Sequence, residues 1–453
     1  MNHPAHDSVR LRIAIVGSGI AGLSAAWLLS QRHAVTLFES NHTLGGHANT
    51  VEVIDGRAVL PVDTGFIVYN ETNYPNLVAL FGALAVPSAP SDMSFSASLR
   101  DGELEYAGTN LAGLLAQPRN LLRPRFWRML NDLRRFYRQA PSYLENTRDE
   151  MTLGALLRAH GYSRAFCQDH LLPMAAAIWS ASTHEMEHIP ARTFIDFFNN
   201  HGLLRLTGRP QWRTVLGGAR EYVQRLRAAM SGAAVIHQRV RRIERASTHA
   251  LLETADGALH RFDHVVVATH ADQALRLLGT PSTAEHQILG AFRYAQNDAV
   301  LHEDRALMPR RRAAWASWNY LERGAGNNDR AVSVTYWMNR LQPLATTREI
   351  FVSLNPTHPP SAGLTHYQTR YAHPQFDRRT QLAQRLLWQL QGQHRTWFCG
   401  SYFGAGFHED ALQAGLWVAE QLGGAARPWS LPTAPSRIGL PPPEWRVPLS
   451  VAA

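Results

Sequence analysis

Residues 11–50 read LRIAIVGSGIAGLSAAWLLSQRHAVTLFESNHTLGGHANT. An apolar run at 13–16 leads directly into three glycines with the spacing G-x-G-x-x-G, which are Gly17, Gly19 and Gly22. A stretch of helical character at 22–31 and a second apolar run at 34–38 follow, and the second run ends at Glu39. A strand, a glycine-rich turn, a helix and a second strand that ends in an acid together predict a dinucleotide-binding unit.

Each part of this unit has a physical reason. Gly17 permits the tight turn, Gly19 lets the backbone approach a pyrophosphate, and Gly22 lets the helix pack closely on the strand. Free N–H groups at the start of the helix favour phosphate, and an acid such as Glu39 accepts hydrogen bonds from ribose hydroxyls. We therefore expect cofactor contacts from Gly17, Ser18, Gly19, Ile20, Ala21, Gly22, Glu39 and Ser40.

The residues after Glu39 indicate which dinucleotide is bound. A second glycine pair follows in the pattern E-x5-GG, and this extension resembles the flavin amine oxidase superfamily, which includes monoamine oxidases, protoporphyrinogen oxidases and phytoene desaturases. The resemblance implies FAD as the cofactor. Thr43 and His47 stand where that superfamily usually has arginines, and the stretch DTGF at 63–66 resembles the next block, where the chain passes the flavin ring. These blocks imply contacts at Gly45, Gly46, His47, Gly65 and Phe66.

A third block lies near the C-terminus, where 406–415 read GFHEDALQAG after the short apolar strand 397–400. It resembles the final FAD block of the superfamily, in which the backbone at the start of a helix donates to the pyrimidine edge of the flavin. The helix is expected over 410–421, and His408 is our candidate for a catalytic, titrating group at the flavin. A strand pair at 234–243 resembles the segment that meets the adenine. The implied contacts are Val240, Gly400, Ser401, His408, Glu409, Asp410 and Ala411.

These blocks define the predicted domain organisation. The fold class is α/β, with a Rossmann-like FAD-binding domain of the glutathione-reductase type and an interleaved α+β substrate domain. The FAD-binding domain is expected from 1–70, 210–290 and 390–425, and the substrate domain from 71–209 and 291–389. The second part of the substrate domain is rich in strand formers, whereas helices are expected to dominate from 70 to 210. Residues 426–453 are a proline-rich tail.

Composition excludes several kinds of chemistry. The 453 residues include no lysine, so all 45 basic residues are arginine, the net charge is +9, and an amine oxidase mechanism that uses a lysine-bound water is ruled out. The two cysteines make a disulfide framework improbable and fit a reducing compartment. His270, His286 and His302 are scattered in the sequence, so we expect no metal site, and no nucleic-acid-binding module is recognisable. A signal peptide and a membrane-spanning run are also absent, which predicts a cytoplasmic protein.

Two segments of the middle region have more than one interpretation. Residues 121–137, LLRPRFWRMLNDLRRFY, combine apolar residues at helical spacing with five arginines. Such a helix either packs on the protein with a solvated basic face or lies on an anionic membrane as a peripheral contact. The small apolar stretch 173–182, PMAAAIWSAS, either lines a substrate cavity or belongs to the core.

The stretch from His373 to Gly415 resembles more closely a bacterial group known as predicted NAD/FAD-binding proteins, whose genes often lie near those for cyclopropane-fatty-acyl-phospholipid synthase-like enzymes. This resemblance implies a small-molecule or lipid acyl substrate. We expect an FAD-dependent oxidoreductase that transfers hydride from an apolar substrate to flavin N5. The alternatives are amine oxidation without the lysine device, a non-redox flavoenzyme of the isomerase or mutase type, and a non-catalytic partner that delivers lipid.

Overall fold

The predicted strand–helix–strand unit forms the centre of a parallel sheet in the computed structural model, which describes residues 10–146, 151–205, 208–322, 333–431, 437–439 and 441. Strand β1 (Arg12–Val16) pairs with β2 (Ala34–Phe38) in parallel register, and helix α1 (Ile20–Ser30) connects the two strands. Residues 13–16 are almost completely buried, because a parallel sheet is covered on both faces. The sequence prediction for this unit is therefore confirmed in type and position.

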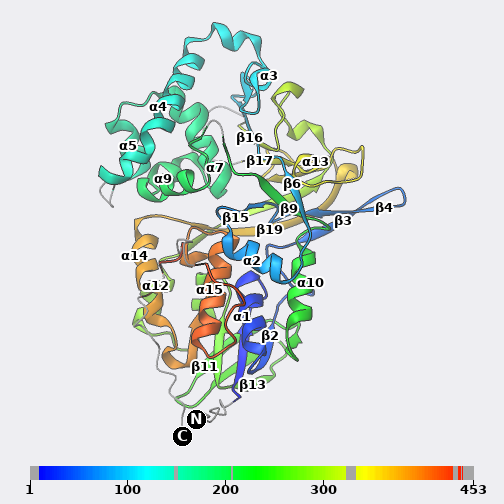
Figure 1. The fold of residues 1–453 in the computed structure, drawn as a ribbon, viewed down its shortest axis with the longest axis vertical. Helices are drawn as coiled ribbons and strands as arrows, with labels where there is room; N and C mark the ends of the chain where they lie inside the picture. Colours follow the sequence, from blue (N-terminus) through cyan, green and yellow to red (C-terminus); the bar gives the residue numbers. More distant parts are fainter. Residues whose placement is uncertain are drawn as a thin grey trace.

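Three distant segments complete this sheet. Its order is β10-β2-β1-β14-β20, and the added strands are β10 (Ala234–Ile236), β14 (His264–Val267) and β20 (Thr396–Phe398). Helices α10 (Arg220–Ala229) and α15 (His408–Gln421) pack beside α1, as Figure 1 shows. Gly415 allows α15 to approach closely, since a Cβ at this position would lie 2.2 Å from the Ala21 carbonyl oxygen. A small antiparallel sheet also belongs to this half of the molecule and consists of β11 (Val240–Arg245), β12 (Ala250–Thr254) and β13 (Leu259–Phe262).

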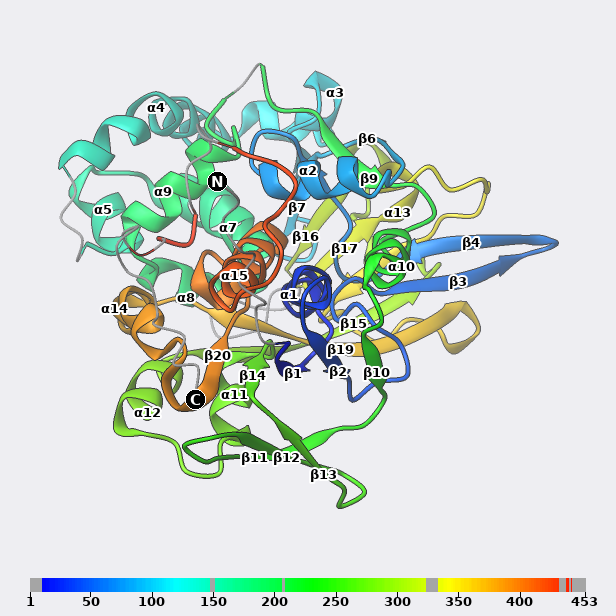
Figure 2. The same cartoon turned by 60° about the horizontal axis from the view of Figure 1, so that its bottom comes forward.

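The other half of the molecule is built on a seven-stranded sheet of order β19-β15-β18-β17-β16-β7-β8. The strands are β7 (Phe95–Leu99), β8 (Leu104–Ala107), β15 (Arg293–His302), β16 (Trp318–Leu321), β17 (Ser333–Trp337), β18 (Phe351–Leu354) and β19 (Thr365–Gln375). Helices gather beside this sheet (Figures 1 and 2) and include α4 (Pro124–Asn146), α5 (Leu153–Ala159), α7 (Leu172–Trp179), α8 (Thr183–His188) and α9 (Ala191–Asn200). The fold is thus α/β, with a Rossmann-like parallel sheet and a second α+β part.

Shorter elements join the two halves. Strands β3 (Thr50–Asp55) and β4 (Ala58–Asp63) form a hairpin that projects from the body of the molecule in Figure 2. Strands β5 (Tyr69–Asn70), β6 (Ser88–Ser91) and β9 (Trp212–Val215) form a three-stranded sheet beside helix α2 (Pro75–Ala83). Further helices of the half built on the parallel sheet are α11 (Ala271–Leu277), α12 (Thr283–Leu289) and α14 (Arg378–Leu386).

Strands β7 and β8 were not expected, because the sequence between 70 and 210 suggested helices. Ser96 and Ser98 give β7 a polar appearance, but both are buried. Their hydroxyl groups donate to Asn319 at 2.8 Å and to Glu105 at 2.9 Å. Buried hydroxyl groups that have partners cost little, so a serine-rich strand is stable inside the sheet. Periodicity of apolar residues does not reveal such a strand.

The basic helix is an ordinary packed helix along most of its length. Helix α4 buries Phe126, Met129, Phe136, Tyr137 and Ala140 against the neighbouring helices. Its apolar side is therefore covered by protein, as in the first of the two interpretations of this segment, and a peripheral membrane contact remains a hypothesis. In the part of the chain that the structure describes, no helix is long and apolar enough to cross a bilayer. The predicted tail lies largely outside the described residues.

Candidate cofactor and substrate site

A cavity of about 1560 Å³ begins at the carboxyl ends of the parallel strands and continues into the half built on the seven-stranded sheet. This is the edge at which ligands bind in open α/β sheets. Most of the predicted cofactor contacts line it, namely Gly17, Ser18, Gly19, Ile20, Ala21, Glu39, Ser40, Gly45, Gly46, His47, Gly65, Phe66, Val240, Gly400, Ser401, His408 and Ala411. The predicted residues Gly22, Glu409 and Asp410 are not part of the lining.

The glycine loop has the properties of a phosphate site. Gly17 has φ +102°, and a Cβ there would lie 2.9 Å from the Ala268 carbonyl oxygen, so this turn requires glycine. Gly19 is the N-cap of α1, with no side chain capping the helix and no acid in its first turn. The uncapped end of α1 lines the cavity, and it supplies free N–H groups and a positive dipole. Nearby cationic lining residues are Arg239, Arg241 and Arg276.

Glu39 connects the two ends of the nucleotide-binding unit. One carboxylate oxygen accepts hydrogen bonds from Ser18 N at 3.0 Å and Ser18 Oγ at 2.6 Å. The other accepts from Ser40 Oγ at 3.1 Å and Asn41 N at 2.9 Å. A carboxylate has about four acceptor positions, and Glu39 already uses them to hold the loop. The contact with a ribose therefore remains a prediction, and a second role, fixing the glycine loop, is added to it.

The second glycine pair brings three loops together. A Cβ at Gly46 would lie 3.2 Å from Gly19 Cα, and a Cβ at Gly65 would lie 2.2 Å from the His47 carbonyl oxygen. Backbone hydrogen bonds fix this contact, since Gly45 N donates to Ser18 O at 3.0 Å and Phe66 N donates to His47 O at 2.7 Å. The three sequence blocks that suggested FAD therefore converge on one wall of the cavity.

Three histidines gather where the superfamily usually has an arginine. The ring of His47 lies 6.0 Å from that of His270 and 5.6 Å from that of His373, and it stacks on Tyr371 at 4.9 Å. Burial lowers the pKa of His47 well below its usual value and that of His373 to about 4. His270 thus lies beside His47 and His373 and not beside His286 or His302. Among the described residues, no group of three or more His, Cys, Asp and Glu is arranged to hold a metal ion.

His408 lies on the wall of the cavity, where its ring stacks on Phe66 at 3.8 Å. Its Nε2 atom is 3.1 Å from the Tyr222 hydroxyl. Burial lowers the pKa of His408 to about 3, so the ring is neutral near pH 7. A neutral ring orients a ligand by stacking and hydrogen bonding, which does not fit the titrating group that we expected; a catalytic role remains a prediction.

The side chains of Glu409 and Asp410 bind protein groups outside the cavity. Glu409 accepts hydrogen bonds from the first amides of α2, Asn76 N at 3.1 Å and Leu77 N at 3.0 Å. Asp410 accepts from Phe407 N at 2.8 Å, which caps the start of α15, and it pairs with Arg437 at 3.0 Å. The acids of the stretch FHED therefore position helices, and a cofactor contact from them is restricted to the backbone.

Beyond the cofactor wall the cavity becomes an apolar chamber. Its lining here comes from β7, α7, α9 and the sheet strands β16, β17 and β18, and it includes Phe95, Met174, Ile178, Trp179, Phe197, Leu203, Trp318, Tyr336, Leu354 and Phe407. The stretch 173–182 contributes both to this lining and to the core, since Ala175 and Ala176 are fully buried. Both interpretations of that stretch are correct for different residues of it.

His201 is a residue of the chamber that the sequence did not reveal. Its ring stacks on Phe197 at 3.8 Å, and its Nδ1 atom is 2.8 Å from the Phe197 carbonyl oxygen. A carbonyl only accepts, so Nδ1 carries the proton. Burial lowers the pKa of His201 to about 3, and the neutral ring leaves Nε2 as an acceptor without a partner among the described residues. No motif surrounds this residue, and only the fold places it in the site.

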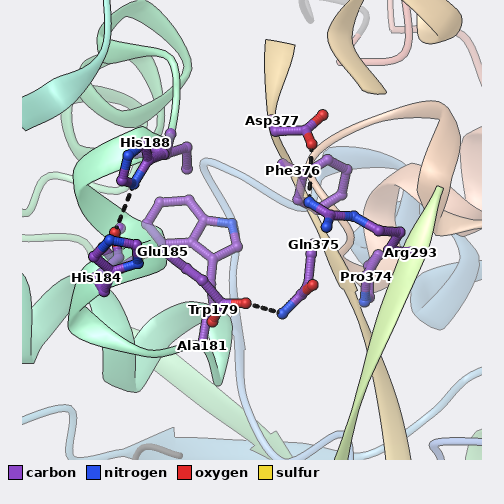
Figure 3. A pocket seen from close by; sticks show the side chains of 12 residues that line it. Trp179, Ala181, His184, Glu185, His188, Arg293, Pro374, Gln375, Phe376 and Asp377 are labelled. Atoms are coloured by element: carbon purple, nitrogen blue, oxygen red, sulfur yellow. Dashed lines mark hydrogen bonds and ion pairs between the residues drawn. The ribbon is translucent and has the colours of Figure 1, made fainter. Parts of the chain in front are cut away.

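A second, smaller pocket of about 280 Å³ adjoins the chamber (Figure 3). Trp179, Pro374 and Phe376 line both spaces and separate them. On one side of the small pocket α8 contributes His184 and His188, and the opposite side combines Pro374 and Phe376 with polar residues. The pair Arg293–Asp377, 3.0 Å apart, closes that side. The small pocket is therefore a largely apolar space with an ion pair and two histidines at its edge.

Comparisons with known proteins agree with this geometry. The family model described as "Flavin containing amine oxidoreductase" matches residues 20–423. The structure of a fatty acid isomerase from P. acnes that produces CLA is similar, with a TM-score of 0.63, 13% identity, and coverage of 92% of this chain and 98% of that one. Cyclohexylamine oxidase from Brevibacterium oxydans IH-35A is similar with a TM-score of 0.63, 16% identity, and coverage of 91% and 99%. At these identities the two structures show a shared fold.

Proposed function

This chain belongs to the family of flavin-containing amine oxidoreductases and is an FAD-dependent oxidoreductase, and we propose that its substrate is an apolar molecule with a lipid acyl chain. The proposal rests on the chamber beside the cofactor wall. When bound, FAD supplies an acceptor for hydride at N5, and the protein supplies binding, orientation and exclusion of water. The residues of the cavity wall fit this cofactor, because the glycine loops converge there and α1 presents an uncapped N-terminus.

The observation that carries the proposal is the charge of the lining. Among the described lining residues, Glu39 is the only carboxylate, and Ser18 holds it at the nucleotide end of the cavity. No lining acid therefore lies in the chamber, where apolar and aromatic side chains dominate. A saturated or monounsaturated chain gains free energy in such a space, at about 25 cal/mol per Å² of apolar area removed from water.

An ammonium group fits this chamber poorly. A cation that leaves water needs an opposite charge or several acceptors. The described lining of the chamber offers no carboxylate, and its acceptors are neutral groups such as His201 Nε2 and the hydroxyl groups of Tyr336 and Thr369, beside aromatic faces. Aromatic faces stabilise a cation by about 1–2 kcal/mol, which offsets only part of the desolvation cost. His201 Nε2 is better suited to a neutral donor, such as a hydroxyl group of the substrate or one ordered water.

A pair of ligands with the same chain tests this preference. We expect decanamide to bind the oxidised, FAD-loaded protein about tenfold more tightly than decylamine at neutral pH, because only the amine must give up its hydration as a cation. Binding is measured from the change in flavin absorbance and by calorimetry. Decylamine should bind more tightly as the pH approaches its own pKa. Equal or tighter binding of decylamine at neutral pH would count against the acyl proposal and would favour amine oxidation.

A second candidate uses the same chamber without net oxidation. The structural neighbour from P. acnes is described as a fatty acid isomerase, so this fold accommodates redox-neutral chemistry on an acyl chain. The chamber of this protein is suitable for either reaction, because its apolar lining binds the acyl chain and does not determine whether the substrate is oxidised. Product analysis separates the two, since an isomerase yields a product of unchanged mass and an oxidoreductase yields one that has lost two hydrogens.

A further inference from the structure

We propose that residues 118–128, which we call the apex, form a docking surface for a membrane that contains anionic lipid. The apex comprises η1 (Pro118–Leu122) and the first residues of α4, and it lies at the end of the molecule opposite β11 and β13 (Figure 1). This surface differs from the one expected from sequence, because the apolar side of α4 is buried. The proposal goes beyond the proposed chemistry and does not depend on it.

The apex exposes large apolar side chains that nothing among the described residues covers. Leu122 is 86% exposed, Trp127 51% and Leu121 45%. The indole N–H of Trp127 donates to the Leu121 carbonyl oxygen at 2.8 Å, which brings these residues into one patch. Single exposed leucines are common on protein surfaces, but three large apolar side chains on one projecting turn mark an interaction site.

The protein holds this patch in a fixed conformation. Gln117 Nε2 donates to the Gly102 carbonyl oxygen at 2.8 Å, and Asn120 Nδ2 donates to the Glu105 carbonyl oxygen at 3.2 Å. Arg125 at the start of α4 forms two hydrogen bonds with the buried carboxylate of Asp169, at 2.6 and 3.0 Å. A turn that is anchored at several points and still presents leucine and tryptophan to solvent is preorganised for a partner, because little entropy is lost on binding.

The charge around the patch selects the kind of partner. The stretch 111–138 contains Arg119, Arg123, Arg125, Arg128, Arg134, Arg135 and Arg138, whereas Asp132 is its only carboxylate. Arg119, Arg125 and Arg128 are the exposed arginines of the apex itself. Arg119 and Arg123 donate to the backbone carbonyl oxygen of Glu103, an exposed acid beside them. Leucine and tryptophan at the centre with arginine at the rim is the arrangement that binds an interface of anionic lipid, where each basic residue adds about 1 kcal/mol. Two copies of the apex would bring like charges together, which disfavours self-association through this surface.

Vesicle sedimentation with the full-length, FAD-loaded protein tests the proposal. We expect the protein to sediment with vesicles of phosphatidylcholine that contain about one third phosphatidylglycerol, and to be released by high salt. The double variant Leu122→Ser/Trp127→Ser should bind these vesicles at least about tenfold more weakly. The pair Arg119→Gln/Arg128→Gln should weaken binding and reduce its dependence on salt. The matched control is Leu259→Ser, because Leu259 is 63% exposed but lies on β13 in the other half of the molecule.

The outcomes are distinct. Wild-type protein that stays in the supernatant with anionic vesicles overturns the proposal, and so does an apex variant that binds like the wild type. A loss of binding in the Leu259→Ser control would also contradict it, since the effect would not be specific to the apex. Unchanged flavin absorbance and melting temperature show that the variants are folded. A dimer that disappears in the Leu122→Ser/Trp127→Ser variant would instead assign the patch to a second copy of the chain.

Discussion

The Gly22→Ala variant is expected to lose FAD binding and to unfold at a much lower temperature than the wild type. A Cβ at this position would lie 1.9 Å from the Gly17 carbonyl oxygen, which is a backbone atom and cannot move without opening the loop. The loop is also fixed by the Gly17 N–H, which donates to the Phe38 carbonyl oxygen at 2.9 Å. We expect a loss of about 3 kcal/mol or more in the free energy of unfolding. Urea denaturation and the flavin content after purification measure both effects.

Gly19→Ala is the matched control in the same loop. Gly19 has φ −63°, and a Cβ there would meet no atom of the protein within 4 Å. The variant should therefore fold with stability within about 1 kcal/mol of the wild type. It should nevertheless bind FAD at least about tenfold more weakly, because the added methyl group projects where the backbone must approach the pyrophosphate. Wild-type affinity in Gly19→Ala, or normal stability in Gly22→Ala, would contradict this account of the loop.

The second large effect is a loss of stability in mild acid. Burial lowers the pKa of His170, His264 and His302 to about 4, whereas an unfolded histidine has a pKa of about 6.5. These residues are absent from the lining of the cavity, so the cofactor does not cover them. As the pH falls, the unfolded chain takes up protons before the folded protein does. The stability that the three neutral histidines contribute is therefore complete above pH 6.5 and is lost toward pH 4. Each histidine lowers the free energy of unfolding by about 1.4 kcal/mol for every pH unit in this range.

A buried acid changes stability in the opposite direction. Burial raises the pKa of Asp63 to about 7, so the folded protein binds this proton more readily and gains stability as the pH falls below 7. Burial also raises the pKa of Asp196 and Asp410, but it lowers the pKa of His33 in addition to that of the three histidines above. The histidines outnumber the acids, and we expect net destabilisation between pH 6.5 and 5. Urea unfolding at several pH values measures the slope. His302→Gln should reduce it by about one proton, and an unchanged slope in this variant, or a wild type that is more stable at pH 5, would refute the prediction.

The cofactor half of the molecule could be predicted because its signals are local. The turn at Gly17, the helix that begins at Gly19 and the strand that ends at Glu39 follow from a few consecutive residues. Strand 34–38 has the predicted bounds, and α15 begins only two residues before its predicted start at 410. Such elements depend on backbone conformation and periodicity, which a sequence displays directly.

The chamber could not be predicted because its residues meet only in the folded protein. His201 follows α9, His373 lies on β19, and His47 follows the second glycine pair, and no spacing in the sequence connects them. Glu409 and Asp410 were predicted as cofactor contacts, but their side chains cap α2 and α15. The sequence shows which residue types are present, whereas the assembled sheets decide which of them face the cavity.

The measurement that tests the central claim most directly is anaerobic reduction of the flavin by added substrate, followed by absorbance. We would add monounsaturated or methylated phospholipids to the oxidised wild-type protein, and primary amines of similar chain length in parallel. The account predicts that the acyl substrates bleach the flavin band and that the amines do so far more slowly. If amines bleached the flavin and acyl substrates left it oxidised, the result would contradict the account. It would favour amine oxidation as the function of the protein.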